Sequence, residues 1–233
     1  RVIAARSVTL EALDRAPVIV PGFLWDLMPE SVQNAIRVSL DDTPLDMNVN
    51  ILTMAASVAG VGTVAVGATG AINIIVNTIR AEIVDSTVSA VMGDVHLSAE
   101  SESRITAFTA GLSASETFSL NAAGTLNNVT SAVEAMIGGG AAVGAAGAVT
   151  LEARDASAVT AIVFNVAASQ NTALAVNGTG NRIAHTVRAA LAGSEVNAGS
   201  DLSLTARSDA GIFAFAGGLA AASTAAGMLC ITL

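Results

Sequence analysis

Apolar and polar residues alternate along three segments of the chain, at 79–83 (Ile-Arg-Ala-Glu-Ile), 133–137 (Val-Glu-Ala-Met-Ile) and 187–191 (Val-Arg-Ala-Ala-Leu). Side chains of a β-strand point alternately to its two faces, so a period of two is that of a half-buried strand. β-Branched Val and Ile fill five of the six apolar end positions of these stretches, and glycine interrupts nearly every window long enough for a stable helix. We therefore predict strands joined by Gly, Ser and Asn turns.

The alternating segments belong to a pattern that recurs at a fixed spacing. Tracts that begin with Gly and end with Asn start at positions 70, 124 and 178, which are 54 residues apart. A second series, of the type Val/Leu-x-Leu-x-Ala, opens at positions 8, 95, 149 and 202. The 87 residues from 8 to 95 exceed one period and indicate an insertion at about 13–49. The predicted units are a first repeat with this insertion, two full repeats and a partial fourth: 1–92, 93–146, 147–199 and 200–233.

A fixed period of this kind is typical of stacked units, because no single unit can bury its apolar face alone. We predict an all-β fold, a parallel β-solenoid or β-helix built from repeats of about 54 residues. Equivalent positions would then form columns, with strands about 4.8 Å apart along the axis. The sequence leaves open whether each repeat makes one wide coil or two smaller ones.

A structural role can be predicted for three columns: one of asparagines, one of glycines and one of charged residues. The asparagines have two interpretations, which are not exclusive: a ladder of stacked amides, or turn residues that tolerate a left-handed backbone. The glycines are expected to supply a bend with positive φ or a place where backbones crowd. The charged column alternates in sign, which avoids repulsion between neighbours, and is most typical of a solvated face. The columns are Asn73, Asn127 and Asn181; Gly70, Gly124 and Gly178; and Arg80, Glu134 and Arg188.

The insertion differs in composition from the repeats. All four prolines and the single tryptophan lie in it or at its start, and 29–37 reads as a short helix with Pro29 in its first turn. Phe23 and Trp25 form a candidate interaction loop, although packing over the solenoid wall is the favoured interpretation. A weak candidate for a Ca²⁺ site lies nearby, but its spacing matches no EF-hand loop and the nonapeptide of calcium β-rolls is absent, so we expect no metal there: Asp41, Asp42 and Asp46.

Composition narrows the partners. The chain is 52% hydrophobic and 3% aromatic, with 10 basic against 19 acidic residues and a pI near 4.5. This acidity argues against nucleic acid and anionic membranes as partners. The segment 51–79 is uncharged and long enough to span a bilayer, but equivalent positions in later repeats hold Glu116 and Arg182. We therefore predict no membrane span. The single cysteine, Cys230, excludes an internal disulfide.

No catalytic constellation is recognisable. His96 and His185 align with small polar residues in other repeats, which indicates surface or turn positions. The sequence contains no Gly-x-Ser-x-Gly elbow, zinc-protease motif or phosphate loop. We expect no enzyme activity, cofactor or metal, although β-helical carbohydrate-active enzymes share the predicted scaffold.

The motifs at 149–157 (Val-Thr-Leu-Glu-Ala-Arg-Asp-Ala-Ser) and 184–191 (Ala-His-Thr-Val-Arg-Ala-Ala-Leu) resemble the long repeats of giant bacterial exoproteins and adhesins of the filamentous-haemagglutinin-like and leukotoxin-like kinds. The resemblance covers most of 50–233 and implies a secreted or surface-displayed β-solenoid stalk, with no catalytic residue. The expected role is an extracellular structural or adhesive rod that contacts neighbouring repeats and a host surface or glycan. The alternative is a subunit of a self-assembling filament, in which open solenoid ends pair.

Overall fold

In a computed structural model, residues 1–16, 49–60 and 62–233 are described, and their regular structure consists of β-strands. This bears out the prediction of an all-β chain. The strands, in chain order, are β1 (Val2–Ala4), β2 (Val8–Asp14), β3 (Ile51–Gly60), β4 (Val64–Val84), β5 (Thr87–Ala90), β6 (Val95–Ser101), β7 (Arg104–Ser115), β8 (Phe118–Gly138), β9 (Ala142–Ala145), β10 (Val149–Asp155), β11 (Ala158–Ser169), β12 (Thr172–Ala192), β13 (Glu195–Ala198), β14 (Leu202–Ser208), β15 (Gly211–Ala221) and β16 (Ala225–Thr232).

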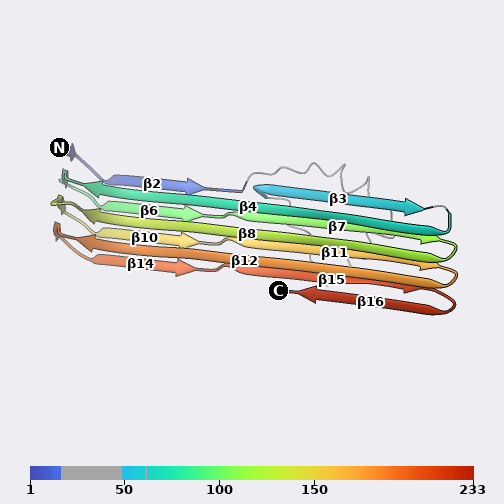
Figure 1. The fold of residues 1–233 in the computed structure, drawn as a ribbon. Coiled ribbons are helices and arrows are strands. Elements are labelled where there is room, and N and C mark those ends of the chain that lie inside the picture. Colours follow the sequence, from blue (N-terminus) through green and yellow to red (C-terminus); the bar gives the residue numbers. More distant parts are fainter. Residues whose placement is uncertain (17–48, 61) are drawn as a thin grey trace.

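The strands form stacked parallel sheets, and each circuit of the chain adds one strand to each sheet (Figure 1). The strand orders are β1-β5-β9-β13, β2-β6-β10-β14, β3-β7-β11-β15 and β4-β8-β12-β16. All pairings between neighbours are parallel. This arrangement is compatible with a β-helix or β-solenoid.

The pairing register follows the sequence pattern. Gly70 of β4 pairs with Gly124 of β8, which pairs with Gly178 of β12. Three further strands, one in each of the other sheets, lie between these partners along the chain, so each repeat makes one wide coil rather than two small ones. In the first coil, Val8 pairs with Val95 but Ile51 pairs with Ile105, so the additional residues fall between β2 and β3.

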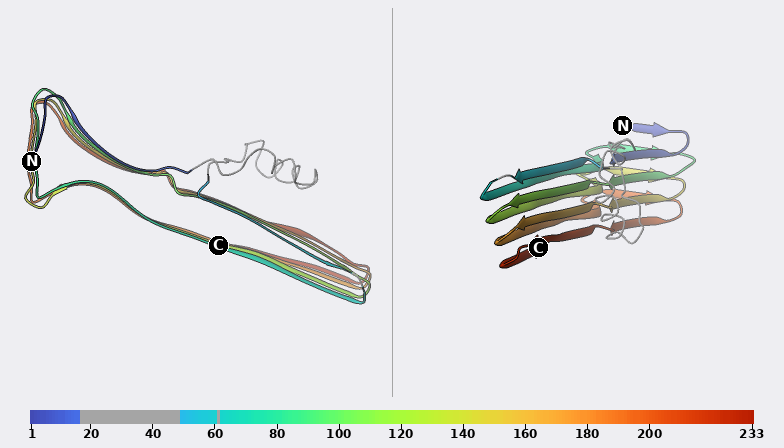
Figure 2. Two further views of the ribbon diagram at one scale, coloured as in Figure 1. Left: turned by 90° about the horizontal axis from the view of Figure 1, so that it is seen from above. Right: turned by 90° about the vertical axis from the view of Figure 1, so that its right-hand side faces the viewer.

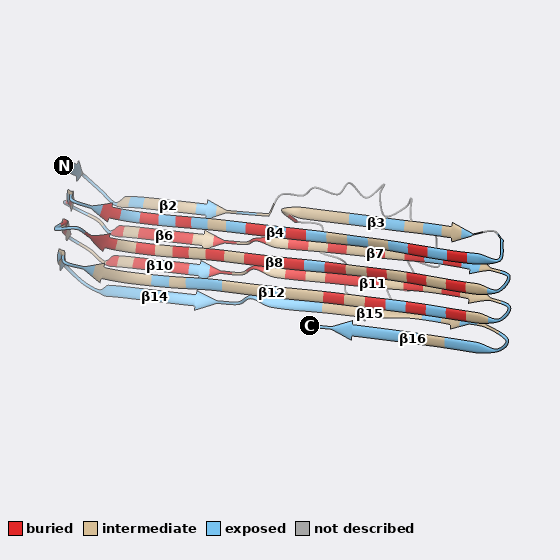
Figure 3. Cartoon of the chain, in the orientation of Figure 1, coloured by how far each residue is buried: buried red, intermediate tan, exposed pale blue. Residues whose placement is uncertain are grey.

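The coil is long and flat, with a broad lobe at one end (Figure 2). An aliphatic core fills this lobe, between the short β1-β5-β9-β13 sheet, the β2-β6-β10-β14 sheet and the C-terminal halves of β4, β8 and β12. Its fully buried members include Leu97, Val133, Ile137, Val149 and Leu151. Figure 3 shows buried residues concentrated in the two middle coils.

Beyond the lobe, the β3-β7-β11-β15 sheet approaches the N-terminal halves of β4, β8, β12 and β16. The residues that face inward here are small or polar, such as Ala107, Asn121, Ala161 and Asn165. Large aliphatic side chains point outward instead, as Val58 and Ile72 do. We call this part the flat wing. Its sheets lie close together because small side chains occupy the space between them.

Candidate functional site

The aligned asparagines lie side by side inside the stack. Asn73 Nδ2 donates a hydrogen bond to Asn127 Oδ1, and Asn127 Nδ2 donates to Asn181 Oδ1, both at 2.7 Å. Thr53 Oγ1 donates to Asn73 Oδ1 at 2.5 Å, which extends the chain of bonds to β3. Asn73 and Asn127 are buried within 21-residue strands, so the turn interpretation is wrong for these positions. An amide suits such a ladder because it carries both a donor and an acceptor.

The aligned glycines do not bend the chain. They lie in the middle of extended strands, and the prediction of positive φ at these positions is wrong. The backbones crowd at Gly124, where a Cβ would lie 3.3 Å from the carbonyl oxygen of Gly178, but not at Gly70 or Gly178, where the nearest atoms lie at 3.5 and 4.0 Å. Among the described residues, the glycines with positive φ are Gly62, Gly139, Gly140 and Gly193.

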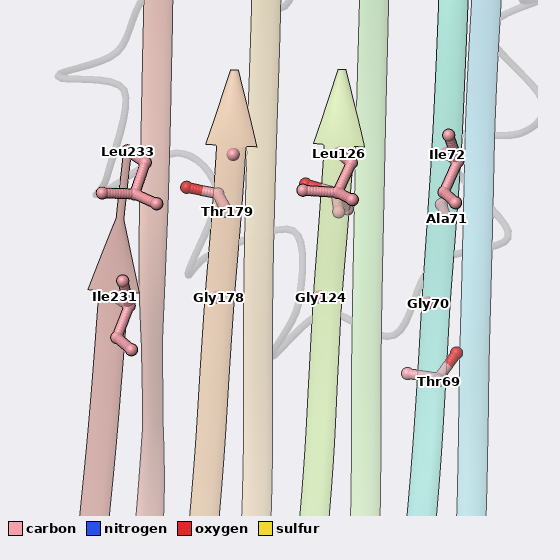
Figure 4. Close-up of a pocket in the computed structure, with 12 residues that line it drawn as sticks. Thr69, Gly70, Ala71, Ile72, Gly124, Leu126, Gly178, Thr179, Ile231 and Leu233 are labelled. Atoms are coloured by element: carbon pink, nitrogen blue, oxygen red, sulfur yellow. The ribbon is translucent and has the colours of Figure 1, made fainter. Parts of the chain in front are cut away.

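The glycines instead form the floor of a groove on the outer face of the β4-β8-β12-β16 sheet. Because they follow the strand alternation, their missing side chains leave a furrow that crosses the strands along the stack. Ile72 and Leu126, two residues further along each strand, form the ridge beside it (Figure 4). The groove has a volume of about 530 Å³. Its surface is apolar, and the exposed fractions of Ile72 and Leu126 are 72% and 57%.

A second polar column crosses the interior beside the aliphatic core. Asn77 Nδ2 donates to Asp14 Oδ2 at 2.5 Å and to Ser103 Oγ at 2.7 Å. One coil further on, Ser131 Oγ donates to Asp155 Oδ2 at 2.5 Å. These bonds join the β4-β8-β12-β16 sheet to the β2-β6-β10-β14 sheet across the coil.

Asp155 is fully buried but has the partners that a carboxylate needs. Its Oδ1 accepts the Ser157 backbone N–H at 3.0 Å, and its Oδ2 accepts the Ser157 hydroxyl at 3.2 Å in addition to that of Ser131. A carboxylate enclosed in this way is satisfied by protein groups and has a structural role.

His185 lies in register with this column, within β12 rather than in a turn, and its side chain is exposed, as the surface interpretation predicted. Its Nε2 lies 2.8 Å from Ser208 Oγ, and its neighbours in register are Ser131 and, through β8, Asn77. The Ser208–His185 bond therefore repeats the cross-coil contact of Asn77 with Asp14. The serine–histidine pair is therefore another contact between the two opposing sheets. His96 is half-buried on the outer face of β6, which also agrees with the predicted surface position.

We did not predict from the sequence that this polar column faces inward, although the spacing of its residues indicates it. Asn77 is separated by an even number of residues from the inward Asn73 and from Ile79, so strand alternation places all three on one face. The same rule applied to Ser131 and His185 identifies a polar column between aliphatic ones. The partner Asp14 is 63 residues from Asn77, and only the coil brings them together.

The charged columns are ion pairs between neighbouring coils. Arg80 Nε lies 2.9 Å from Glu134 Oε2, and Arg154 Nη1 lies 2.8 Å from Glu100 Oε1. Asp209 accepts from both Arg207 and Arg154. The hydrogen bond from Arg207, helped by that from Arg154, holds the pKa of Asp209 below its ordinary value. Hydrogen bonds to Glu100 and Asp209 raise the pKa of Arg154. Exposed pairs of this kind add little stability.

Several predicted features lie outside the described residues. They are the candidate loop residues Phe23 and Trp25, the short helix at 29–37, and the acidic residues Asp41, Asp42 and Asp46. Within 1–16, 49–60 and 62–233, no three His, Cys, Asp or Glu side chains gather as a metal ion would require.

Comparison with known proteins returned no match, whether to family models, to curated proteins or to solved structures. In the described part of the chain, no helix is long and apolar enough to cross a membrane.

Proposed function

We propose that this chain is a non-catalytic structural module, a β-solenoid built from repeats of about 54 residues with a Pro-rich insertion in the first, that acts outside a bacterial cell or on its surface. The observation that carries the proposal is the bonding along the stack. Equivalent side chains in successive coils bond to one another, as in the ladder from Asn73 through Asn127 to Asn181. Such columns hold coils in register and make the stack rigid, which is what a structural element requires.

The dimensions of the coil indicate what such a module is suited to do. Each coil adds only about 4.8 Å along the axis, whereas a 21-residue strand extends about 70 Å across it. A stalk that only spans distance would use narrower coils. The wide coil provides broad, flat sheet faces instead, which favours a role in contact and assembly. The resemblance of the repeats to bacterial adhesins and exoproteins supports an adhesive role, with a host surface or glycan as ligand.

Immunogold electron microscopy of the source cells tests the location and role together. Antibodies raised against the purified chain should label fibres or projections on intact cells, and prior absorption with the purified chain should abolish the label. Label that appears only after the cells are permeabilised would refute an extracellular role. Surface label without any visible structure would leave the location standing and refute the structural role.

A filament subunit is the second candidate, and the open ends of the stack favour it. Among the described residues, 182–192 of β12 have a paired strand on one side only, as do β13, β14, β15 and β16. Unpaired strand edges are templates for further pairing. The purified chain should then elongate into uniform fibres, and sonicated fibres should shorten the lag of fresh protein. Absence of elongation at high concentration and with seeds would exclude this candidate.

A further inference from the structure

The outer face of the β4-β8-β12-β16 sheet is mostly apolar in the flat wing, with polar residues at Asn128, Thr130 and Thr172. From Val64 to Val76 in β4, the residues that point outward are aliphatic or glycine. The equivalent outward positions in the other three strands carry a single charged residue, Arg182. An apolar surface of this extent marks a contact site on a soluble protein.

We propose that this face binds the same face of a second copy of the chain. The argument rests on the order of the columns. The glycine groove and the Ile72–Leu126 ridge are adjacent, two residues apart along each strand, and the ridge spans two coils because the equivalent residue of β12 is Gly180. A face that carries a ridge beside a groove of matching direction is complementary to itself.

A two-fold axis parallel to the stack, between groove and ridge, places each ridge in the partner's groove. Ile72 then faces Gly70 of the other copy, and Leu126 faces Gly124 of the other copy. The same surface is used on both sides, as required for a closed dimer. The two stacks run parallel, with their first coils side by side, and the match of ridge and groove covers the first two coils.

The available area is sufficient. Thirteen residues from Val64 to Val76 extend about 43 Å, and four strands measure about 19 Å across. Because β16 covers only part of this length, the face offers about 750 Å² per copy, close to the size of a standard stable interface. A lipid surface is a poorer occupant because it has no ridge to fill the groove, and because the net charge of −9 opposes anionic headgroups.

Sedimentation velocity of the purified chain from 1 to 100 μM tests the proposal with three variants. Ile72→Glu places a charge on the ridge. Gly70→Ile fills the groove with an apolar side chain, where a Cβ would meet only the Gly124 carbonyl oxygen at 3.5 Å. Val58→Glu is the matched control, since Val58 is 80% exposed and lies on the opposite outer face of the wing.

We expect a dimer that both Ile72→Glu and Gly70→Ile weaken at least tenfold, and that Val58→Glu leaves unchanged. Gly70→Ile is decisive, because it adds apolar surface and would strengthen any association that lacks a shape requirement. It also gives a result if Ile72→Glu does not fold.

Three outcomes would overturn the proposal. The first is a wild-type monomer at 100 μM. The second is a dimer that persists in both face variants, which would assign association to the strand edges. The third is a monomer that sediments with phosphatidylcholine vesicles and loses this binding in Ile72→Glu, which would make lipid the occupant.

Discussion

Asparagine is a weak strand former, yet three of them occupy the interiors of long strands in this protein. They are tolerated there because the residue at the same position of the neighbouring strand is also an asparagine. Each amide meets another amide at hydrogen-bond distance, so donor and acceptor are satisfied without water. Asn77 and Asp155 follow the same principle with partners from the opposite sheet. In the ladder from Asn73 to Asn181, buried polarity is tolerated because each amide bonds to the next.

Asn127→Val tests the ladder at its centre, where the asparagine is 3% exposed. Removing this amide leaves the Asn73 donor and the Asn181 acceptor without their partner, at about 1–3 kcal/mol for each buried group. We expect a lower midpoint in thermal and urea unfolding, equivalent to about 2–4 kcal/mol. Thr130→Val, on the outward face of the same strand, is the control and should shift the midpoint little. Equal midpoints for the two variants would contradict a stabilising ladder.

The inward face of each long strand changes character along its length. The C-terminal half of β8 turns aliphatic residues inward to the lobe, whereas its N-terminal half turns small and polar residues inward to the flat wing. Strand alternation is unbroken across this change. The strand thus serves a wide core and a narrow one, and side-chain size is matched to the space at each point.

Gly111→Ala tests how narrow the flat wing is. Gly111 of β7 points inward, and a Cβ there would lie 2.6 Å from Asn121 Oδ1 and would also contact Asn165 Oδ1. Overpacking of this kind costs about 1–3 kcal/mol, so the unfolding midpoint should fall. Gly144→Ala is the matched control, because a Cβ at that position meets nothing within 4 Å. The prediction fails if both alanines are tolerated equally.

The whole molecule is wider than it is tall, because four coils add little height while each coil extends along a full 21-residue strand. Its stability is distributed between neighbouring coils, as in other stacked repeats, with most of the apolar burial in the lobe. Its outer faces are correspondingly large for a chain of 233 residues.

Small-angle X-ray scattering measures this shape directly. A compact globule of this length has a radius of gyration of about 17–18 Å. A flat particle about 70 Å long and about 19 Å high should give about 22 Å. The measurement is best made at concentrations below those of any self-association, or on Ile72→Glu. A value near that of the globule would contradict the extended coil.

The sequence alone determined which residues are equivalent and that they lie in strands. A spacing of 54 residues brings Asn73, Asn127 and Asn181 into one column, and alternation puts them on one face, since both properties are local. The Arg80–Glu134 pair follows from the same spacing.

Only the tertiary structure decided which of the two faces is inside. In the flat wing the aliphatic face of β4 is outside, because the opposing sheet comes so close that only small and amide side chains fit between them. Coil width and the contact of Asn77 with Asp14 also depend on that sheet. These properties arise from segments far apart in the chain, and alternation within a strand contains no information about what the strand will meet.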